Sequence, residues 1–520
     1  MKASAYSCEA AACSLKADAI LPMEVVPEAS HMDCSTQTDN IFIENSAILE
    51  VISLKKKVQE LGKELQKSKT MKNNLSNFLT DGQIRKVINP DSKMHWAWSD
   101  IPNAICLNAA GPRAYRHLYN KGFPLPHKST LQRWVRKIDI EEGILHFCID
   151  SMKFSNGMLA DEKLCVLSFD EMRLCVTYEY DQSVNLVREP VNYVQVAMAR
   201  GLKKSWKQPV FYRFNCKMTK SIVVEIITAL HDATYTVVAV VSRNMSPANQ
   251  SLLKELGVSV EKPWFDSPNR ADDKIFVFAD APHLLKRIRN HFVDTGFVWN
   301  GIILKSEIIK ELIENVSTSD LSTVHKLTMD HLLVGYGGRQ KVKLAAQLFS
   351  NTTANAVRCF SVGRELYQPH ETADFIQLIN DWFDIFNSKL KTMGFPGKKP
   401  YGKDLVYQNG ILENMDSFMA NPIVPKKQLT ENASCSENTN LTKRSLAPFQ
   451  KGILMSNNAL RKLYTYVKDR YNIDHILTYR LNQNVLENFF SAIQSKGVPN
   501  DHPSPKDFKI RLRKYVLGKC

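Results

Sequence analysis

LCVLSFDEM (164–172) is the stretch of sequence that decides the fold, because an apolar run there ends on an acidic residue, Asp170. A short continuous apolar run predicts a central strand that is covered on both faces. IFVFA (275–279) is a second run of this kind and is followed by Asp280. Between them, YTVVAVVSRNM (235–245) leads to Asn244. The sequence therefore predicts an α/β fold in which polar side chains follow buried strands.

The order of the expected elements between residues 164 and 292 is that of an RNase H-like sheet: three strands, a helix, a strand, a helix and a strand. The strands are expected at 164–170, 173–180, 191–199, 235–242 and 274–280, with an extra strand-like stretch at 209–215. Helices are expected near 218–231, 247–256 and 282–292. Glu487 lies in a later amphipathic helix, 481–495, which is expected to rejoin this sheet.

The residues between these parts form a mainly helical insertion. Helices are predicted at 306–316, near 340–350 and at 372–391, and the polar stretch 421–447 is typical of a flexible loop. The predicted fold is therefore a mixed sheet split by a helical insertion.

The N-terminal part combines a polar tail, a short heptad pattern and a basic helical unit. Val51, Leu54, Val58, Leu61 and Leu65 alternate by three and four, so residues 47–68 are expected to pair two chains as a coiled coil; the alternative is a single surface helix. Residues 76–145 are expected to form a helix-turn-helix. Its last helix carries residues that would contact DNA or else form a solvated face, namely Gln132, Arg133, Arg136 and Lys137.

Composition favours a polyanionic partner and excludes several classes of protein. The formal net charge is +15 and the pI is about 9.1, which suits contact with phosphates. The eleven cysteines are scattered without a CxxC pair, so a disulfide framework is not expected. No apolar run reaches the length of a membrane span, and the N-terminus lacks a secretory signal pattern.

Several phrases, in order along the chain, resemble the P-element transposases and the related THAP-domain transposases. They are LSFDEM (167–172), DAPHLLKRIRN (280–290), KVKLAAQLFS (341–350), INDWFDIFNS (379–388) and NQNVLENFFSAIQSKG (482–497). WSDIPNAI (98–105) and FPLPHKSTLQRW (123–134) resemble the helix-turn-helix of that family, so the likeness covers about 76–510. Cys8 and Cys13 are not followed by a suitable Cys-x2-His, so the THAP zinc finger is expected to be absent.

The resemblance implies a catalytic site of three acids that hold Mg²⁺, with Asp170 and Glu487 as metal ligands. Where the family reads valine-serine-aspartate-methionine, this chain reads VVSRNM, so Asn244 replaces the second acid. An amide offers a neutral oxygen but no charge, and two-metal phosphoryl transfer relies on anionic ligands. Asp280 is expected to be the N-cap of helix 282–292, with a role as second acid as the alternative. His283 and Lys286 on that helix are expected to pack or to touch phosphate.

The insertion resembles the GTP-binding domain of the family. The resemblance implies guanine-nucleotide contacts at Lys326, Val342, Ser350, Asn380 and Asp384. Asn484 stands where the family has an aspartate, and an amide cannot accept both N–H donors of a guanine edge.

The function expected from these features is that of a domesticated or decayed P-element-type transposase-like protein that binds DNA and has a degenerate metal-dependent catalytic site. An active Mg²⁺-dependent transposase and a dimeric DNA-binding regulator are the alternatives, and the nucleus is the expected place of action. The expected parts are a tail (1–44), a coiled coil (45–70), a helix-turn-helix (76–145), the first part of the RNase H-like domain (146–295), the insertion (296–475) and the second part (476–520).

Overall fold

The computed structural model describes residues 36–517 apart from short gaps, and these residues fall into two compact units, Met1–Ile88 and Asn89–Cys520. The gaps are 138–139, 154–156, 182–184, 243–244, 317–325, 334, 336, 363–365, 367, 391–393, 422–445 and 496–501. Among the described residues, no helix has both the length and the hydropathy required to cross a membrane.

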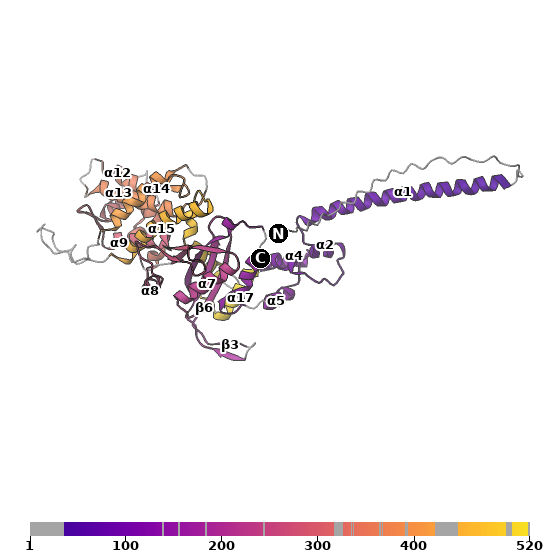
Figure 1. Cartoon of the computed structure of the whole chain (residues 1–520), viewed down its shortest axis with the longest axis horizontal. Helices are drawn as coiled ribbons and strands as arrows, with labels where there is room; N and C mark the ends of the chain where they lie inside the picture. The colour runs from indigo at the N-terminus through magenta and orange to yellow at the C-terminus, as the bar shows by residue number, and fades with distance from the viewer. Residues whose placement is uncertain are drawn as a thin grey trace, which may run out of the picture. The chain divides into compact units, whose positions relative to one another are not determined.

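The first unit contains one long helix, α1 (Thr36–Ser76), and a short one, α2 (Asp81–Ile88). Figure 1 shows α1 as a continuous helix. It begins inside the segment expected to be a polar tail and extends beyond the expected coiled coil on both sides. The apolar heptad residues from Val51 to Leu65 are exposed in this single chain.

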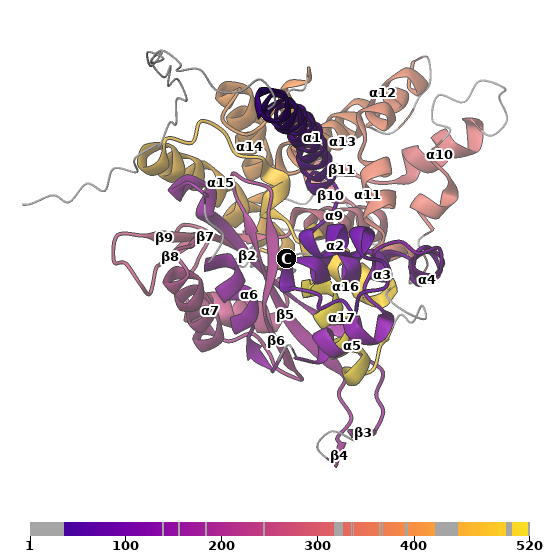
Figure 2. The same ribbon diagram turned by 90° about the vertical axis from the view of Figure 1, so that its right-hand side faces the viewer.

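The second unit is built on a seven-stranded mixed sheet with the strand order β1-β6-β5-β2-β7-β9-β8. β2 pairs in parallel with β7, and β7 pairs in parallel with β9, whereas the other pairs are antiparallel. This arrangement confirms the expected RNase H-like fold, and Figure 2 shows the strands side by side. The strands are β1 (Gly143–Ile144), β2 (Leu164–Arg173), β5 (Tyr193–Gly201), β6 (Lys207–Phe214), β7 (Thr236–Ser242), β8 (Trp264–Asp266) and β9 (Lys274–Ala279).

One strand assignment from the sequence is wrong. Residues 173–180 were expected in the sheet, but β2 ends at Arg173 and the chain leaves the sheet toward the hairpin β3 (Glu179–Asp181) and β4 (Leu186–Arg188). Val176 and Tyr178 are exposed, and the Cys175 N–H donates to the Pro503 carbonyl instead of a strand. The stretch 209–215, expected to be extra, lies in β6 and is the third strand of the fold.

Two of the expected helices lie on either side of β7 along the chain. α7 (Lys220–Asp232) precedes β7, and α8 (Pro247–Glu255) follows it.

The face of the sheet that carries Asp170 is covered by two helices from the C-terminal part of the described chain. Asp170 pairs with Val196 in the antiparallel register, and Met172 pairs with Val194, so these side chains share one face of the sheet. Met172, Val194 and Val196 belong to a hydrophobic cluster with α16 (Asn484–Ser495) and α17 (Pro505–Leu517).

Three helices of the segment expected to form a helix-turn-helix are part of the same cluster. They are α3 (Ile101–Ala110), α4 (Pro112–Asn120) and α5 (Lys128–Lys137), preceded by the turn η1 (Trp98–Asp100). α3 and α5 both pack against α17. The next helix, α6 (His146–Lys153), packs on β6. The N-terminal helices of this unit therefore share their core with the last helix of the chain.

The insertion is mainly helical, as expected, and its core continues that of the sheet. The expected helix near 340–350 is α11, a second helix, α12, follows it at once, and the helix expected to reach residue 391 ends at Phe386. The loop expected at 421–447 lies mostly outside the described residues. The elements are α9 (Ala281–Asp294), β10 (Phe297–Trp299), β11 (Ile302–Leu304), α10 (Glu307–Val316), α11 (Val342–Leu348), α12 (Asn351–Phe360), α13 (Pro369–Phe386), α14 (Leu405–Met419) and α15 (Pro448–Tyr471), with turns η3 (Met329–His331), η4 (Gly338–Gln340) and η5 (Pro396–Lys398).

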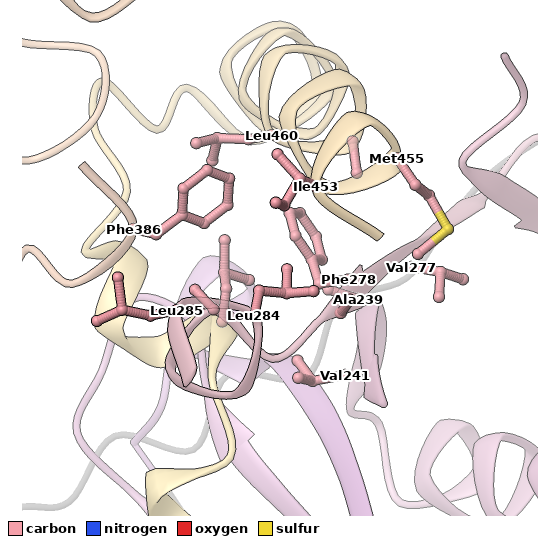
Figure 3. Close-up of a cluster of buried hydrophobic side chains, with 14 of the residues drawn as sticks. Ala239, Val241, Val277, Phe278, Leu284, Leu285, Phe386, Ile453, Met455 and Leu460 are labelled. Carbon is pink, nitrogen blue, oxygen red and sulfur yellow. The ribbon is translucent and has the colours of Figure 1, made fainter. Parts of the chain in front are cut away.

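Figure 3 shows how the insertion is fixed to the sheet. Ile453 and Leu460 of α15 lie with Phe386 of α13 over Phe278 of β9 and Leu284 of α9. All five side chains are at most 3% exposed. Burial of each such side chain contributes roughly 1.5–3 kcal/mol, so the insertion and the sheet form one packed body.

Candidate functional site

Asp170 lies near the carboxyl end of β2 and is 8% exposed. Its neighbours on β2 are hydrophobic, and the strand is buried from Leu164 to Phe169. α16 packs on β2, on the face that Asp170 shares with Met172. Asp170 is therefore a buried carboxylate at the end of a central strand, and this position makes it a candidate functional group.

Glu487 lies in the first turn of α16 and is exposed. Gln483, immediately before α16, fixes the start of this helix to two strands. Its Nε2 donates to the Phe169 carbonyl at 2.8 Å and to the Val241 carbonyl at 3.1 Å. Because Phe169 directly precedes Asp170, one buried amide joins the segment that carries Asp170 to the helix that carries Glu487.

Asp280 is the N-cap residue of α9. Its Oδ2 accepts from the His283 backbone N–H at 3.1 Å and lies 3.0 Å from His283 Nδ1. Its Oδ1 accepts from the Gln483 backbone N–H at 2.8 Å, and the residue is 1% exposed. An N-cap carboxylate satisfies helix N–H groups that have no partner within the helix. Asp280 thus joins α9 to the start of α16.

The segment that leads into α16 is fixed by two arginines. It forms the turn η7 (Thr478–Leu481), and Arg480 Nη1 donates to the carbonyls of Gly201 and Leu202 at 3.3 and 2.8 Å. Arg200 Nη1 donates to the Tyr479 carbonyl at 3.2 Å. Burial lowers the pKa of the Arg200 guanidinium to about 10. The chain therefore returns from the insertion to the end of β5 along a fixed path.

The metal ligands implied by the resemblance are only partly represented. Asn244 lies outside the described residues. Within the described part of the chain, no group of three or more His, Cys, Asp or Glu side chains is arranged to hold a metal ion. Asp170 and Glu487 supply two carboxylates from neighbouring elements. These two residues alone do not make a complete two-metal site.

The residues implied in nucleotide contact come from several elements of the insertion and from α16. Among the described residues of this set, hydrogen bonding joins only Asn380 and Asp384: Asn380 Nδ2 lies 3.4 Å from Asp384 Oδ2. Burial raises the pKa of Asp384, against the opposing effect of Lys398, whose Nζ lies 3.7 Å away. Ser350 caps α12, Val342 begins α11, Lys326 is exposed and Asn484 begins α16.

The α5 helix presents polar side chains to solvent. Gln132 and Arg133 are exposed, while Leu131 and Val135 are buried in the cluster shared with α17. Arg136 and Lys137 lie in the helix, but their side chains fall outside the described part. The orientation of α5 places Gln132 and Arg133 away from the protein core, where a duplex can reach them.

Comparisons with known proteins agree with this architecture. Residues 140–257 match the TNP-like RNase H N-terminal domain, 282–398 the TNP-like GTP-binding insertion domain and 479–510 the TNP-like RNase H C-terminal domain. The solved Drosophila P element transposase strand transfer complex is 46% identical, with a TM-score of 0.79, and the match covers 87% of this chain and 98% of that one.

The chain belongs to the P element transposase family. It is 45% identical to the Transposable element P transposase of Drosophila melanogaster over 97% of its own length, and 25% identical to the DNA transposase THAP9 of Homo sapiens over 78%. It spans 66% of the first relative and 46% of the second.

One residue of this P element transposase-like site escaped sequence reasoning. The stretch NQN (482–484) drew attention only to Asn484, whereas Gln483 is the residue that makes the structural connections. A glutamine before a helix gives no local signal of contacts to strands more than 240 residues away. The basic residues that follow Asp280 in DAPHLLKRIRN (280–290) were the other feature of the sequence that could have indicated residues near the site.

Proposed function

We propose that this chain is a P element-type transposase-like protein that binds DNA and cuts it weakly, because its metal-dependent three-acid site is degenerate. The observation that carries this proposal is the difference between two positions at the carboxyl ends of the central strands β2 and β7, a region called the sheet edge below. Asp170 and the start of α16 are held there by Gln483, while position 244 carries an asparagine. The strand transfer complex of the similar Drosophila protein supports DNA as the partner and the nucleus as the place of action.

In this proposal each residue has a limited role. Bound divalent ions would polarise a phosphodiester and activate its attacker, and Asp170 and Glu487 would be their ligands. Asp280 and Gln483 would hold the strand ends and α16 in place. Gln132, Arg133, Arg136 and Lys137 would contact DNA from α5. The exposed heptad residues of α1 support pairing of two chains through residues 47–68.

The insertion would take a guanine nucleotide. The half-buried Asp384 has a carboxylate that can accept from the N–H groups of a guanine edge, and Asn380 holds that carboxylate in position. Lys326, Val342 and Ser350 would complete the contacts. Asn484, in place of an acid, would weaken selectivity for guanine over other bases.

The test is metal titration together with a DNA-nicking assay on the natural chain and on Asn244→Asp, with Glu487→Gln as a blank. Restoring one carboxylate should raise Mn²⁺ or Mg²⁺ affinity by about tenfold or more, because each anionic ligand offsets part of the ion's lost hydration. Nicking should rise with it.

Other outcomes would support the alternatives. Strong metal-dependent nicking by the natural chain, lost in Asp280→Asn, would identify an active transposase in which Asp280 is the second acid. Sequence-specific DNA binding by the natural chain without metal binding, even in Asn244→Asp, would favour a dimeric regulator.

A further inference from the structure

A cavity of about 770 Å³ lies beside the sheet edge that carries Asp170. Its wall combines the end of β2, the start of β5, one side of α9 and the turn η4. The side chains that matter for its chemistry are basic: Arg173, His283, Lys286, Arg287, Arg339 and His502. The size falls within the range of roughly 300–1,000 Å³ found for ligand sites.

We propose that this cavity is a phosphate-binding pocket that holds the backbone of a DNA strand next to the Asp170 edge. The inference rests on the proposed function, because it places part of the same DNA. It assigns a task to α9 residues that are neither metal ligands nor part of the α5 surface.

Lys286 is a positioned cation at the centre of this wall. It is 5% exposed, and its Nζ lies 3.2 Å from His283 Nε2. An ammonium can only donate, so His283 Nε2 accepts, and His283 Nδ1 carries the proton that it donates to Asp280 at 3.0 Å. Asp280, His283 and Lys286 therefore form a buried chain that fixes the ammonium at the cavity.

The opposite wall of the cavity is formed by the turn η4 of the insertion, and hydrogen bonds hold this turn in place. The fully buried Arg289 donates through Nη2 to the carbonyls of Gly338 and Arg339 at 3.1 and 3.2 Å. Arg339 makes a two-pronged ion pair with Asp294 at 2.6 and 2.7 Å. Burial lowers the pKa of Arg289, whereas the hydrogen bond to Asp294 raises the pKa of Arg339. η4 is thus held against α9 by backbone and side-chain contacts.

The balance of charges selects phosphate as the ligand. The lining has four Lys or Arg side chains, Arg173, Lys286, Arg287 and Arg339, and one carboxylate, Glu171. Arg339 shares its charge with Asp294, and Arg173 and Arg287 are the exposed cations of the lining. Charge-assisted hydrogen bonds from Lys and Arg are the usual means of holding phosphate oxygens.

The location selects a strand rather than an isolated ion. Arg173 follows Asp170 by three positions on β2, and α9 begins at Asp280 where β9 ends. Residues three apart on a strand point to opposite faces, so the Arg173 side chain lies on the face opposite that of Asp170. A DNA strand that crosses the carboxyl end of β2 would pass both Arg173 and the start of α9. The phosphates of a nucleotide have the same chemistry, so the experiment separates these two sources.

The experiment compares Arg173→Gln/Arg287→Gln with the charge-matched control Lys220→Gln/Lys254→Gln in the full chain. All four side chains are exposed, so both variants should fold. The probes are a fluorescein-labelled DNA duplex, titrated at several salt concentrations, and GTP. Each lost phosphate contact lowers the log–log salt slope by roughly 0.9. We expect the pocket variant to lose about two units of slope and to weaken DNA binding roughly tenfold, with GTP affinity unchanged.

Each other result overturns the proposal in a distinguishable way. DNA affinity and slope equal to those of the control would reject the pocket while leaving the proposed function intact. Loss of GTP affinity alone would assign the cavity to the phosphates of a nucleotide. A natural chain that binds no duplex at low salt would reject the proposed function and this inference together. Lys286→Met gives an independent check: a folded variant with unchanged DNA affinity would also reject the pocket.

Discussion

The sheet edge and the phosphate-binding pocket share α9 and Asp280, yet they have opposite chemical character. At the edge, buried neutral hydrogen bonds from Gln483 hold the strands and α16, and no three His, Cys, Asp or Glu side chains of the described residues are grouped to hold a metal ion. In the pocket beside it, basic side chains from separate elements surround one cavity. A strand can therefore be held without being cut, since holding requires cations and cutting requires anionic metal ligands.

The largest test of this contrast targets the scaffold of the edge. Gln483→Glu keeps the shape of the side chain but removes both donors to Phe169 and Val241, and a carboxylate would face two carbonyl oxygens. We expect the unfolding free energy to fall by about 3 kcal/mol, since buried groups lose their partners. The measurement is the urea midpoint, with the exposed Gln132→Glu as the control. An unchanged midpoint would show that the edge does not depend on this amide.

A smaller effect is expected on α5, which tests whether DNA binding has two independent contributions. Replacement of Arg133, Arg136 and Lys137 by alanine should lower the salt slope by about three units if each contacts a phosphate. The control removes three exposed lysines elsewhere: Lys217, Lys220 and Lys254. Combined with the pocket variant, the losses in binding free energy should add, because separate sites act independently. An unchanged slope in the triple variant would exclude α5 as a DNA-contacting helix.

The smallest effect is expected at Asp384, near the end of α13, where the protonation of one carboxyl makes the stability depend on pH. Burial raises the pKa of Asp384, Lys398 opposes this and Asp381 adds to it. A carboxyl whose pKa is raised by folding binds its proton more tightly in the folded state, so stability falls as the pH rises through the folded pKa. Asp384→Asn lacks this loss and should gain stability relative to the natural chain above a pH of about 4.

The check is the difference in urea midpoint between the two proteins at several pH values. Asp374→Asn, on the exposed side of the same helix, controls for removal of one negative charge. A difference for Asp384→Asn that stays constant with pH, or that reverses sign, would contradict the prediction.

Sequence patterns predicted the sheet well where burial alone determines a strand. β2, β7 and β9 are covered on both faces, so their apolar runs are continuous and easily read. Residues 173–180 have a similar composition but lie outside the sheet, because the pattern of one segment does not say whether a partner strand exists. The chain uses Pro503, far away in sequence, to satisfy the Cys175 N–H.

The acidic residues of the candidate site could be named as candidates from the sequence, whereas the residues that hold them in place could not. Asp170 and Glu487 stand in recognisable phrases, and Asp280 was expected to be a helix cap, which it is. The links among Gln483, Phe169 and Val241 depend on the tertiary structure, whereas the chain from Asp280 to Lys286 is local and joins residues three apart at the start of α9. Hydrogen bonds between residues hundreds of positions apart leave no local period to detect.

The dependence of α3 and α5 on α17 has a consequence for synthesis on the ribosome. The cores of these helices include Phe508, Leu512 and Val516, which are made after the whole insertion. Until then, the apolar sides of α3 and α5 and one face of β5 lack their cover. A nascent chain would thus carry exposed hydrophobic surface through the translation of the whole insertion, and chaperone binding should end only when α17 emerges. Premature termination after residue 495 would accordingly disturb the α5 surface as much as the sheet edge.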